Sequence, residues 1–263
     1  MQIRLDDCVA VVTGASSGIG RAAALALAEA GADVCVQGYS HMADAEALAQ
    51  AIVDRGRRAV AVKADVTRSD EVDRVVRTAV ETLGGVDVAF ANAGVFQMAA
   101  LEETTDEIWN RHLTTNVTSA FFTARRVVPE MKKRGRGKLI LNGSIFGAYG
   151  VPSAAAYCVT KMAIHGLTRA LSIELAPHHI NVNAVAPGNV VTPLNDVLYD
   201  YMAVQAGRPG DRDAGKAVLV KAYPRGRLGD VADIASMVVY LASDAADFIT
   251  GQVMFVDGGY SAQ

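Results

Sequence analysis

Tyr157 and Lys161 are the residues of this sequence whose types and spacing point most directly to proton transfer. They lie four positions apart, so both side chains fall on one face if the segment is helical. A tyrosine hydroxyl has a pKa of about 10, too high for a base near neutral pH, and a nearby lysine ammonium lowers it. The pair therefore predicts a general acid/base, although a Tyr/Lys pair alone is also common on a solvent-exposed helix face.

Further polar residues follow apolar runs and extend this candidate site. Ser144 ends the run KLILNGS, thirteen residues before Tyr157, and Asn92-Ala93-Gly94 follows the run Val86–Ala91. Parallel α/β sheets bind ligands at the carboxyl ends of their strands, where a serine can hydrogen-bond a reacting oxygen. Asn116 stands inside a long helical pattern, where asparagine is unfavourable. A buried Asn116 needs a hydrogen-bond partner, and a solvent-facing one is the alternative.

A glycine-rich loop joins the first apolar run to the first helical pattern. It reads TGASSGIG over residues 13–20, with glycines at 14, 18 and 20. Such glycines permit a tight turn and let backbone approach a pyrophosphate, while the helix N-terminus offers free N–H groups and partial positive charge. Glycines also make ordinary turns, but this position between strand and helix predicts a dinucleotide site. The spacing is GxxxGxG, whereas the general dinucleotide pattern is GxGxxG.

The end of the second strand bears on the choice between NAD and NADP. Val36–His41 reads VQGYSH, without the carboxylate that NAD-binding proteins place there for the ribose 2′-hydroxyl. Ser40 and His41 can donate to a 2′-phosphate, although no Arg or Lys stands beside them and Ser17 occupies the glycine loop. A solvated loop is the alternative for His41. NADP(H) is thus favoured, and NAD(H) stays open.

The elements that must position these residues alternate along the chain. Strands are predicted at Cys8–Val12, Asp33–Gln37, Ala59–Lys63, Val86–Ala91, Lys138–Asn142, Asn181–Ala186 and Val253–Val256. Helices are predicted at Arg21–Ala30, Asp44–Arg55, Glu71–Leu83, Ile108–Lys133, Tyr157–Leu175 and Val231–Leu241. Strict alternation implies a parallel sheet with crossover helices on both faces, a doubly wound α/β (Rossmann) fold. No repeat or Pro/Gly linker divides residues 1–263, so one domain is expected.

The stretch Thr192–Arg227 interrupts this pattern. It is rich in polar residues, carries three prolines, and follows the sixth strand. Long insertions in compact domains are often lids or binding loops, so we expect a substrate lid at about 192–227, with amphipathic helix near 197–202. Its basic residues, Arg208, Arg212, Lys216 and Lys221, are consistent with attraction of an anionic substrate or with an ordinary solvated face.

Composition narrows the class of protein further. The 263 residues are 51% hydrophobic and 20% charged, which supplies a core. The formal net charge of −3 gives no case for nucleic acid or an anionic membrane as partner. Cys8, Cys35 and Cys158 are scattered and lack metal-ligand spacing, which favours a reducing compartment. With neither a signal-peptide pattern nor an apolar run approaching ~20 residues, a cytoplasmic protein without a metal is expected.

Taken together, the motifs resemble the single-domain branch of the short-chain dehydrogenases/reductases. The matching features are TGASSGIG at 13–20, Asp65 after the third strand, NAG at 92–94, Asn116, Ser144, YxxxK at 157–161, Pro187-Gly188 after the sixth strand, and DGG at 257–259. They follow the family's order over roughly residues 5–260. The GxxxGxG spacing is the usual one in this family.

The resemblance implies a role for each candidate catalytic residue. Tyr157 would be the general acid/base for the substrate oxygen. Lys161 would lower the pKa of Tyr157 and bind the nicotinamide ribose. Ser144 would orient and polarise the carbonyl or alcohol, and Asn116 would hold a water that links Lys161 to solvent. Hydride would pass between nicotinamide C4 and the substrate carbon.

The resemblance also implies a cofactor site, a sheet and an assembly. The expected cofactor-binding residues are Gly14, Ser16, Ser17, Gly18, Ile19, Gly20, Tyr39, Ser40, His41, Asp65, Val66, Asn92, Ala93, Gly94, Tyr157, Lys161, Pro187, Gly188, Val190 and Thr192. The sheet would have seven parallel strands. The protein would be a homotetramer, with interfaces formed by the C-terminal strand and the helices around 108–133 and 157–175.

The substrate is constrained only to a class. The expected substrate-facing residues are Ser144, Phe146, Tyr149, Asn189 and Leu194. They suit the interconversion of a secondary alcohol and a ketone of the polyol, sugar, cyclic or 3-oxoacyl type. The alternative is a catalytically idle, cofactor-binding regulator of the same fold. Retention of Asn116, Tyr157 and Lys161 beside Ser144 argues against that alternative.

Overall fold

The computed structural model describes residues 3–263 and contains one sheet of seven parallel strands in the order β3-β2-β1-β4-β5-β6-β7. The strands are β1 (Val9–Val12), β2 (Asp33–Gly38), β3 (Ala59–Lys63), β4 (Val88–Ala91), β5 (Gly137–Asn142), β6 (Ile180–Pro187) and β7 (Val253–Val256). All seven expected strands are present. Chain order reverses between β1 and β4, and such a switch point leaves a crevice at the carboxyl ends of the strands.

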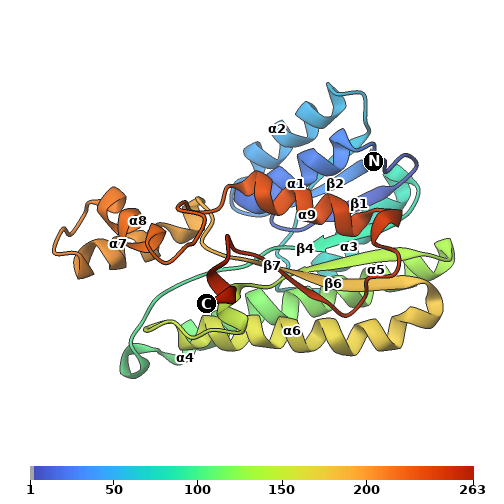
Figure 1. Cartoon of the computed structure of the whole chain (residues 1–263). Helices are drawn as coiled ribbons and strands as arrows, with labels where there is room; N and C mark the ends of the chain where they lie inside the picture. The colour runs from blue at the N-terminus through green and yellow to red at the C-terminus, as the bar shows by residue number, and fades with distance from the viewer. Residues whose placement is uncertain (1–2) are drawn as a thin grey trace.

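Helices cover both faces of the sheet (Figure 1). They are α1 (Gly18–Glu29), α2 (Met42–Val53), α3 (Ser69–Leu83), α4 (Asp106–His112), α5 (Ser119–Arg134), α6 (Ala155–Leu175), α7 (Asp196–Gln205), α8 (Arg212–Val220) and α9 (Val231–Ala242). The helices α1, α2 and α9 pack on one face and α3, α5 and α6 on the other. The expected doubly wound architecture is therefore confirmed.

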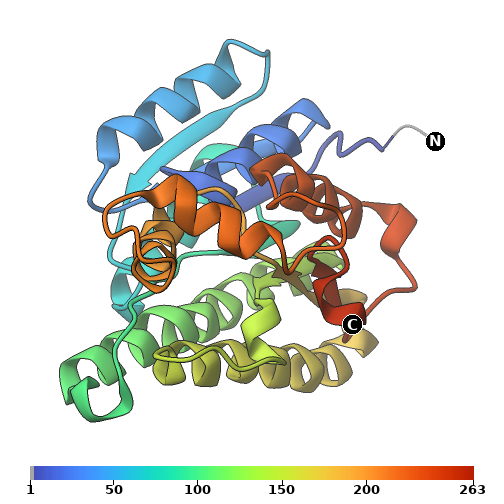
Figure 2. The same cartoon turned by 60° about the vertical axis from the view of Figure 1, so that its left-hand side comes forward.

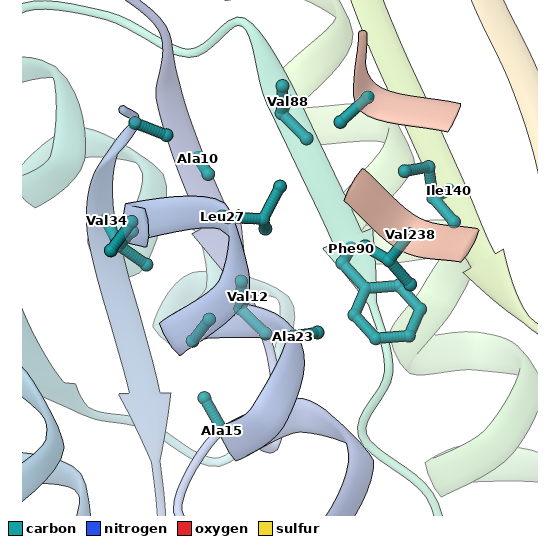
Figure 3. Close-up of a cluster of buried hydrophobic side chains, with 14 of the residues drawn as sticks. Ala10, Val12, Ala15, Ala23, Leu27, Val34, Val88, Phe90, Ile140 and Val238 are labelled. Atoms are coloured by element: carbon teal, nitrogen blue, oxygen red, sulfur yellow. The ribbon is translucent and has the colours of Figure 1, made fainter. Parts of the chain in front are cut away.

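The core follows from the fully apolar strands at the centre of the sheet. Every residue of β1 and β4 is buried, as expected where helices cover both faces. On the α1 face, Val12, Phe90 and Ile140 of the strands meet Leu27 of α1 and Val238 of α9 (Figure 3). This packing fixes the beginning of α1, and with it the glycine loop, against the ends of β1 and β4.

Two expected elements differ from the structure. The expected helix Ile108–Lys133 is divided into α4 and α5 by a π-helical segment, η2 (Leu113–Thr118), which contains Asn116. A π turn carries one extra residue and is frequent at functional sites. The apolar periodicity of the sequence does not reveal this change in the backbone hydrogen bonds. The region 192–227 is less irregular than its composition suggests, because α7 and α8 pack as a pair. This pair projects from the body of the molecule in Figure 1 and comes forward, in front of the sheet, in Figure 2.

No helix within residues 3–263 is long and apolar enough to span a membrane.

Candidate active site

A cavity of about 500 Å³ opens at the carboxyl edge of the sheet. Loops that follow six strands contribute to its wall: Gly14 after β1, Tyr39 after β2, Asp65 after β3, Asn92 after β4, Ser144 after β5 and Gly188 after β6. Residues from α6 and the beginning of the α7–α8 region complete it. The sheet therefore gathers into one elongated site residues that lie up to about 180 positions apart in the chain, which is what the strand-end rule predicts.

The glycine loop requires its glycines for close approach. Gly14 and Gly18 have φ angles of +62° and +53°, a region that favours glycine. A Cβ on Gly14 would lie 2.8 Å from the Cα of Ala93, and one on Gly20 would overlap Gly14 O and Asn92 Nδ2. The backbones of the loop from β1 and the loop from β4 thus approach each other closely, with no room for a side chain at Gly14 or Gly20.

Two side-chain amides hold this loop in place. Gln37, at the end of β2, accepts a hydrogen bond from Gly14 N at 2.7 Å and donates to Ala64 O at 2.6 Å. Asn92 donates from Nδ2 to Thr13 O at 2.9 Å and Gly14 O at 3.1 Å. Each amide ties two strand ends together, so the shape of the loop is set before any ligand binds.

A dinucleotide fits the residues present. At the beginning of α1 no side chain caps the first turn, so N–H groups of the first turn and the helix dipole face the cavity. Glycines replace side chains where a pyrophosphate would approach, and the hydroxyls of Ser16 and Ser17 line the same end. At the other end, Lys161 and Tyr157 would meet the nicotinamide riboside. When bound, a nicotinamide dinucleotide supplies or accepts hydride.

Tyr157 and Lys161 occupy the first two turns of α6 and line the cavity together. Lys161 is 4% exposed, and its Nζ donates to Asn142 O at 2.7 Å and lies 5.5 Å from the centre of the Tyr157 ring. The ammonium is thus held by a strand-end carbonyl beside the phenol ring. Thr160, between the two, donates to Tyr157 O at 2.7 Å within the same helix.

Burial shifts both ionisations toward the neutral forms. Burial raises the pKa of Tyr157 to about 12, and a side-chain hydrogen bond with Ser144 opposes that rise. Burial also lowers the pKa of Lys161 to about 8. Without a bound cofactor, desolvation of the phenolate therefore outweighs the hydrogen bond with Ser144. The role expected of Lys161 in lowering the pKa of Tyr157 stays a prediction.

Ser144 lies directly across from Tyr157, at the beginning of the short helix η3 (Ile145–Gly147). Its Oγ accepts a hydrogen bond from Phe146 N at 3.1 Å, so it caps this turn and keeps a fixed position at the end of β5. The hydroxyl hydrogen remains available to an oxygen in the cavity. Ser144 and Tyr157 can therefore both contact one carbonyl or alcohol oxygen.

Asn116 lies behind the cavity wall and does not line it. It is 2% exposed, accepts from Val95 N at 2.7 Å, and donates to Val95 O at 3.0 Å and Thr160 Oγ1 at 3.1 Å. The solvent-facing alternative for Asn116 is excluded. Its side chain fixes the loop after β4 to α6, while the π segment around it changes the direction of the backbone carbonyls.

The structure brings together most of the expected site residues. Those that line the cavity are Gly14, Ser16, Ser17, Gly18, Ile19, Tyr39, Ser40, His41, Asp65, Val66, Asn92, Ala93, Gly94, Ser144, Phe146, Tyr157, Lys161, Pro187, Gly188, Asn189, Val190, Thr192 and Leu194. Gly20 and Asn116 support the wall from behind. Tyr149 stands apart: it is 36% exposed, and its hydroxyl donates to Ser261 O at 2.8 Å.

Several lining residues escaped the sequence reasoning, chiefly Phe96, Arg111, Asn142 and Gln37. The strand-end rule that selected Ser144 also covers Asn142, and it covers Gln37 at the end of β2. Phe96 follows the NAG motif by two residues, but apolar residues carry no such signal. Arg111 resembles any charged residue on an exposed helix face until the helix is placed beside the cavity.

The region from Pro193 to Arg227 joins the site through polar contacts to the segment after β6. Tyr199 is 1% exposed and donates to Val190 O at 3.2 Å, and Asn195 donates to the same oxygen at 2.7 Å. Tyr223 accepts from Asn189 N at 2.7 Å. Within this region Arg212 pairs with Asp196 and Asp200, which favours the solvated-face alternative for its basic residues.

Comparisons with known proteins agree with this fold and site. Residues 14–261 match the family model described as enoyl-(acyl carrier protein) reductase. The 3-oxoacyl-[acyl-carrier-protein] reductase FabG of Staphylococcus epidermidis is 38% identical over 250 residues, covering 95% of this chain and 97% of its own. The cis-4-hydroxycyclohexanecarboxylate dehydrogenase of Sinomonas cyclohexanicum is 38% identical over 255 residues, covering 97% and 96%.

One similar solved structure contains a bound cofactor. The gluconate 5-dehydrogenase of Burkholderia cenocepacia, in complex with NADP and tartrate, has a TM-score of 0.90 and 32% identity, over 100% of this chain and 98% of that one. The fold and the cavity are those of a doubly wound oxidoreductase. The chain belongs to the short-chain dehydrogenase/reductase family, and it is an NAD(P)-dependent enzyme that acts on CH–OH groups.

Proposed function

We propose that this protein interconverts a secondary alcohol and a ketone, using Tyr157 as general acid/base and NADP(H) as the favoured cofactor. The observation that carries the proposal is the convergence of Ser144, Tyr157 and Lys161 at one end of the cavity whose other end is the glycine loop. A catalytically idle regulator has no need of a buried phenol and a buried lysine in this arrangement, because both cost free energy to desolvate.

Each residue has one task in the proposed mechanism. Ser144 donates to the substrate oxygen and holds it against the Tyr157 hydroxyl. In reduction, Tyr157 gives its proton to the oxygen as the carbonyl becomes an alcohol, and in oxidation it takes that proton back. Lys161 stabilises the resulting phenolate and would hold the ribose of a bound nicotinamide dinucleotide. Asn116 fixes η2 in place, so that the backbone of η2 can bind a water molecule. That water connects Lys161 to solvent.

NADP(H) is proposed over NAD(H) from the end of β2. A carboxylate at the position of Gly38 would repel a 2′-phosphate. A Cβ added to Gly38 would lie 2.9 Å from the Cβ of Ala45, so this position has little room for any side chain. Ser40 and His41 line the cavity next to it and can donate to the phosphate. Side-by-side titration with NADPH and NADH measures the preference. Tighter binding of NADH by more than tenfold would reverse this assignment.

The side chains around the reacting position favour cyclic or acyl substrates over polyols and sugars. Phe96 packs on Tyr157 with ring centres 4.6 Å apart, and Phe146 and Leu194 line the same part of the cavity. A polyol would leave several hydroxyls without partners against these apolar walls, which costs free energy for each one. Asn189 is the polar exception and suits one further oxygen on the substrate.

The proposal extends to a lid and to an assembly. Residues 192–227 are proposed to cover the substrate, because Thr192, Pro193, Leu194 and Asn195 line the cavity while α7 and α8 lie outside it. A homotetramer is proposed because α6 exposes an apolar stripe of Val159, Met162 and Ile173, with Phe121 exposed on α5. Light scattering from the purified protein measures the assembly, and a monomer at micromolar concentration would contradict it.

The experiment that tests the function is a substrate screen. Absorbance at 340 nm is followed while NADPH or NADH meets a panel of cyclic ketones, 3-oxoacyl thioesters, ketoses and keto acids, and the oxidised cofactors meet the matching alcohols. We expect turnover of cyclic or 3-oxoacyl compounds. A protein that binds cofactor and turns over nothing in the panel would instead support the regulator of the same fold.

A further inference from the structure

His112 is a buried titratable residue that the proposed mechanism does not use. It is fully buried, ends α4, and precedes Asn116 by four residues on the same side of the helix. Its ring lies edge-on to the ring of Tyr157, with centres 6.4 Å apart and an interplanar angle of 79°. The hydrogen-bond partners of this buried imidazole show what it holds in place beside the proposed acid/base.

Both ring nitrogens of His112 have partners, and the partners fix its hydrogen. Nδ1 lies 2.8 Å from Ile108 O, a carbonyl that can only accept, so Nδ1 carries the hydrogen. Nε2 lies 3.2 Å from Gln97 N, which can only donate, so Nε2 is the acceptor. The ring is therefore neutral, and its hydrogen bonds connect α4 to the loop after β4.

The same loop is held on its other side by Asn116. Asn116 bonds both backbone groups of Val95, and His112 bonds the amide of Gln97. Phe96, between these two anchored residues, is the one that packs against Tyr157. His112 and Asn116, on consecutive turns, thus bind the backbone on either side of Phe96, which covers the phenol of Tyr157.

We infer that His112 is a positioning residue for the acid/base: by accepting from Gln97 N, it holds Phe96 against Tyr157 and keeps water from that side of the phenol. This inference rests on the proposed role of Tyr157. The hydrogen bond that Gln97 N donates to the uncharged ring fixes one side of the apolar wall, and Asn116 fixes the other. A ring that becomes charged would place an N–H group opposite the N–H of Gln97 and would release the loop.

The surroundings of His112 keep it neutral. Burial lowers the pKa of His112, and the charge of Arg111 next to it acts in the same direction, while its hydrogen bond to Ile108 O opposes them. Tyr157 is the titratable side chain that faces it from α6. The hydrogen bond to Gln97 N is therefore kept at neutral pH and is lost on acidification.

The test compares His112→Leu, which has no acceptor, with His112→Gln, whose amide oxygen can accept from Gln97 N. Val75→Ala, on the buried face of α3, serves as a control that lowers stability at a residue that does not line the cavity. Ionisation of Tyr157 in the NADP⁺ complex is read from phenolate absorbance near 295 nm, as the difference from the same variant carrying Tyr157→Phe. This readout needs no turnover, so it is separate from the substrate screen.

We expect His112→Leu to lower the pKa of Tyr157 by about one unit, because the phenol becomes more hydrated and hydration favours the phenolate. Its kcat falls about tenfold with a smaller change in KM, since the phenol is displaced from its productive position. His112→Gln keeps most of the wild-type behaviour, and Val75→Ala lowers Tm without moving the titration. A wild-type titration in His112→Leu, or equal defects in the Leu and Gln variants, would overturn the inference.

A second measurement applies even if His112→Leu does not fold. Nitrogen NMR of histidine-labelled wild-type protein with NADP⁺ distinguishes a protonated Nδ1 from a protonated Nε2. We expect His112 in the neutral form with hydrogen on Nδ1 at pH 7. A hydrogen on Nε2 would remove the acceptor for Gln97 N and would overturn the inference, whatever the outcome of the substrate screen.

Discussion

The surroundings of Tyr157 keep its phenol protonated, and under the proposed mechanism this sets how the rates of oxidation and reduction depend on pH. Burial raises its pKa to about 12, so in the absence of other charges the residue is an acid ready to donate. The positive charge of a bound oxidised nicotinamide acts the other way and favours the phenolate. The same side chain can thus serve as acid for reduction and as base for oxidation, with cofactor state setting the balance.

A pH profile follows with a definite sign. Alcohol oxidation needs the phenolate, so its rate should rise by up to about tenfold per pH unit below the pKa of Tyr157. Ketone reduction needs the phenol and should stay level through neutral pH, because the raised pKa keeps the hydroxyl protonated. Initial rates in both directions from pH 6 to 10 measure this. Oxidation that is independent of pH over this range would contradict the assignment of Tyr157.

Lys161 is expected to serve both catalysis and cofactor binding. Lys161→Ala should lower kcat at least 100-fold, and it should weaken cofactor affinity by about tenfold, the usual worth of a hydrogen bond to a charged group. Cofactor fluorescence titration and initial rates measure the two effects. Lys138→Ala is a matched control: Lys138 is also buried but bonds Asn181 and Asp247 at the opposite edge of the sheet. If cofactor affinity falls equally in both, Lys161 has no specific role.

At this scale, sequence reasoning identified residue types better than it identified interactions. Ser144, Tyr157 and Lys161 could be selected because strand ends and an i, i+4 spacing are local patterns. The partner of Lys161 could not be foreseen, because Asn142 O is a backbone atom nineteen positions away. Tyr149 was expected to face substrate from its place in the chain, yet its backbone turns it toward Ser261.

Among the elements, the loop between β1 and α1 depends most strictly on its sequence. Gly20→Ala would drive a methyl group into Gly14 O and Asn92 Nδ2, so the loop must shift. We expect cofactor affinity to fall at least tenfold, since pyrophosphate binding depends on where these N–H groups point. Gly150→Ala is the control, because nothing lies within 4 Å of its Cβ position. Unchanged cofactor affinity in Gly20→Ala would show that this loop does not hold the pyrophosphate.

Element types were predictable where the apolar pattern was strong and failed where hydrogen bonding decides. The strands β1 and β4 are uniformly apolar and the other strands are mostly so, and alternation with helices implies their parallel order. The π segment η2 was not predictable, because its extra residue is stabilised by contacts of Asn116 to Val95 and Thr160, which are distant in sequence. In α7 and α8, ion pairs of Arg212 organise a stretch whose polar composition resembles a loop.

For the whole molecule, buried histidines make stability depend on pH. Burial lowers the pKa of His165 to about 4, and its Nε2 has no hydrogen-bond partner. An unfolded histidine titrates near pH 6.5, so the unfolded chain binds more protons between these values. The free energy of unfolding should therefore be highest above about pH 6.5 and fall as the pH drops toward 4.

Denaturant melts at several pH values measure this dependence. His165→Leu should show a shallower decline between pH 6.5 and 4 than the wild-type protein, because it lacks one site that takes up a proton on unfolding. His178→Leu, which replaces an exposed histidine, should retain the wild-type decline. Identical slopes in all three proteins would show that His165 is not the source.

The doubly wound architecture as a whole was predictable, whereas the shape of the cavity was not. Strand order follows from alternation and from the handedness of crossovers, which hold across a large class of folds. The cavity wall depends on side chains such as Phe96 and Arg111, whose positions are set by the packing of α4 against α6. This is why the class of reaction could be predicted from the sequence, whereas the proposed preference for cyclic or acyl substrates rests on side chains that only the structure brings together.

The measurement that tests the account most directly compares wild-type protein with Tyr157→Phe on the best ketone from the screen. NADPH consumption is followed at 340 nm, and NADPH binding is titrated by fluorescence on the same preparations. We predict a loss of turnover of 10²-fold or more in the variant, with cofactor affinity within about threefold of wild type. Turnover retained by Tyr157→Phe would contradict the claim that this phenol carries the proton.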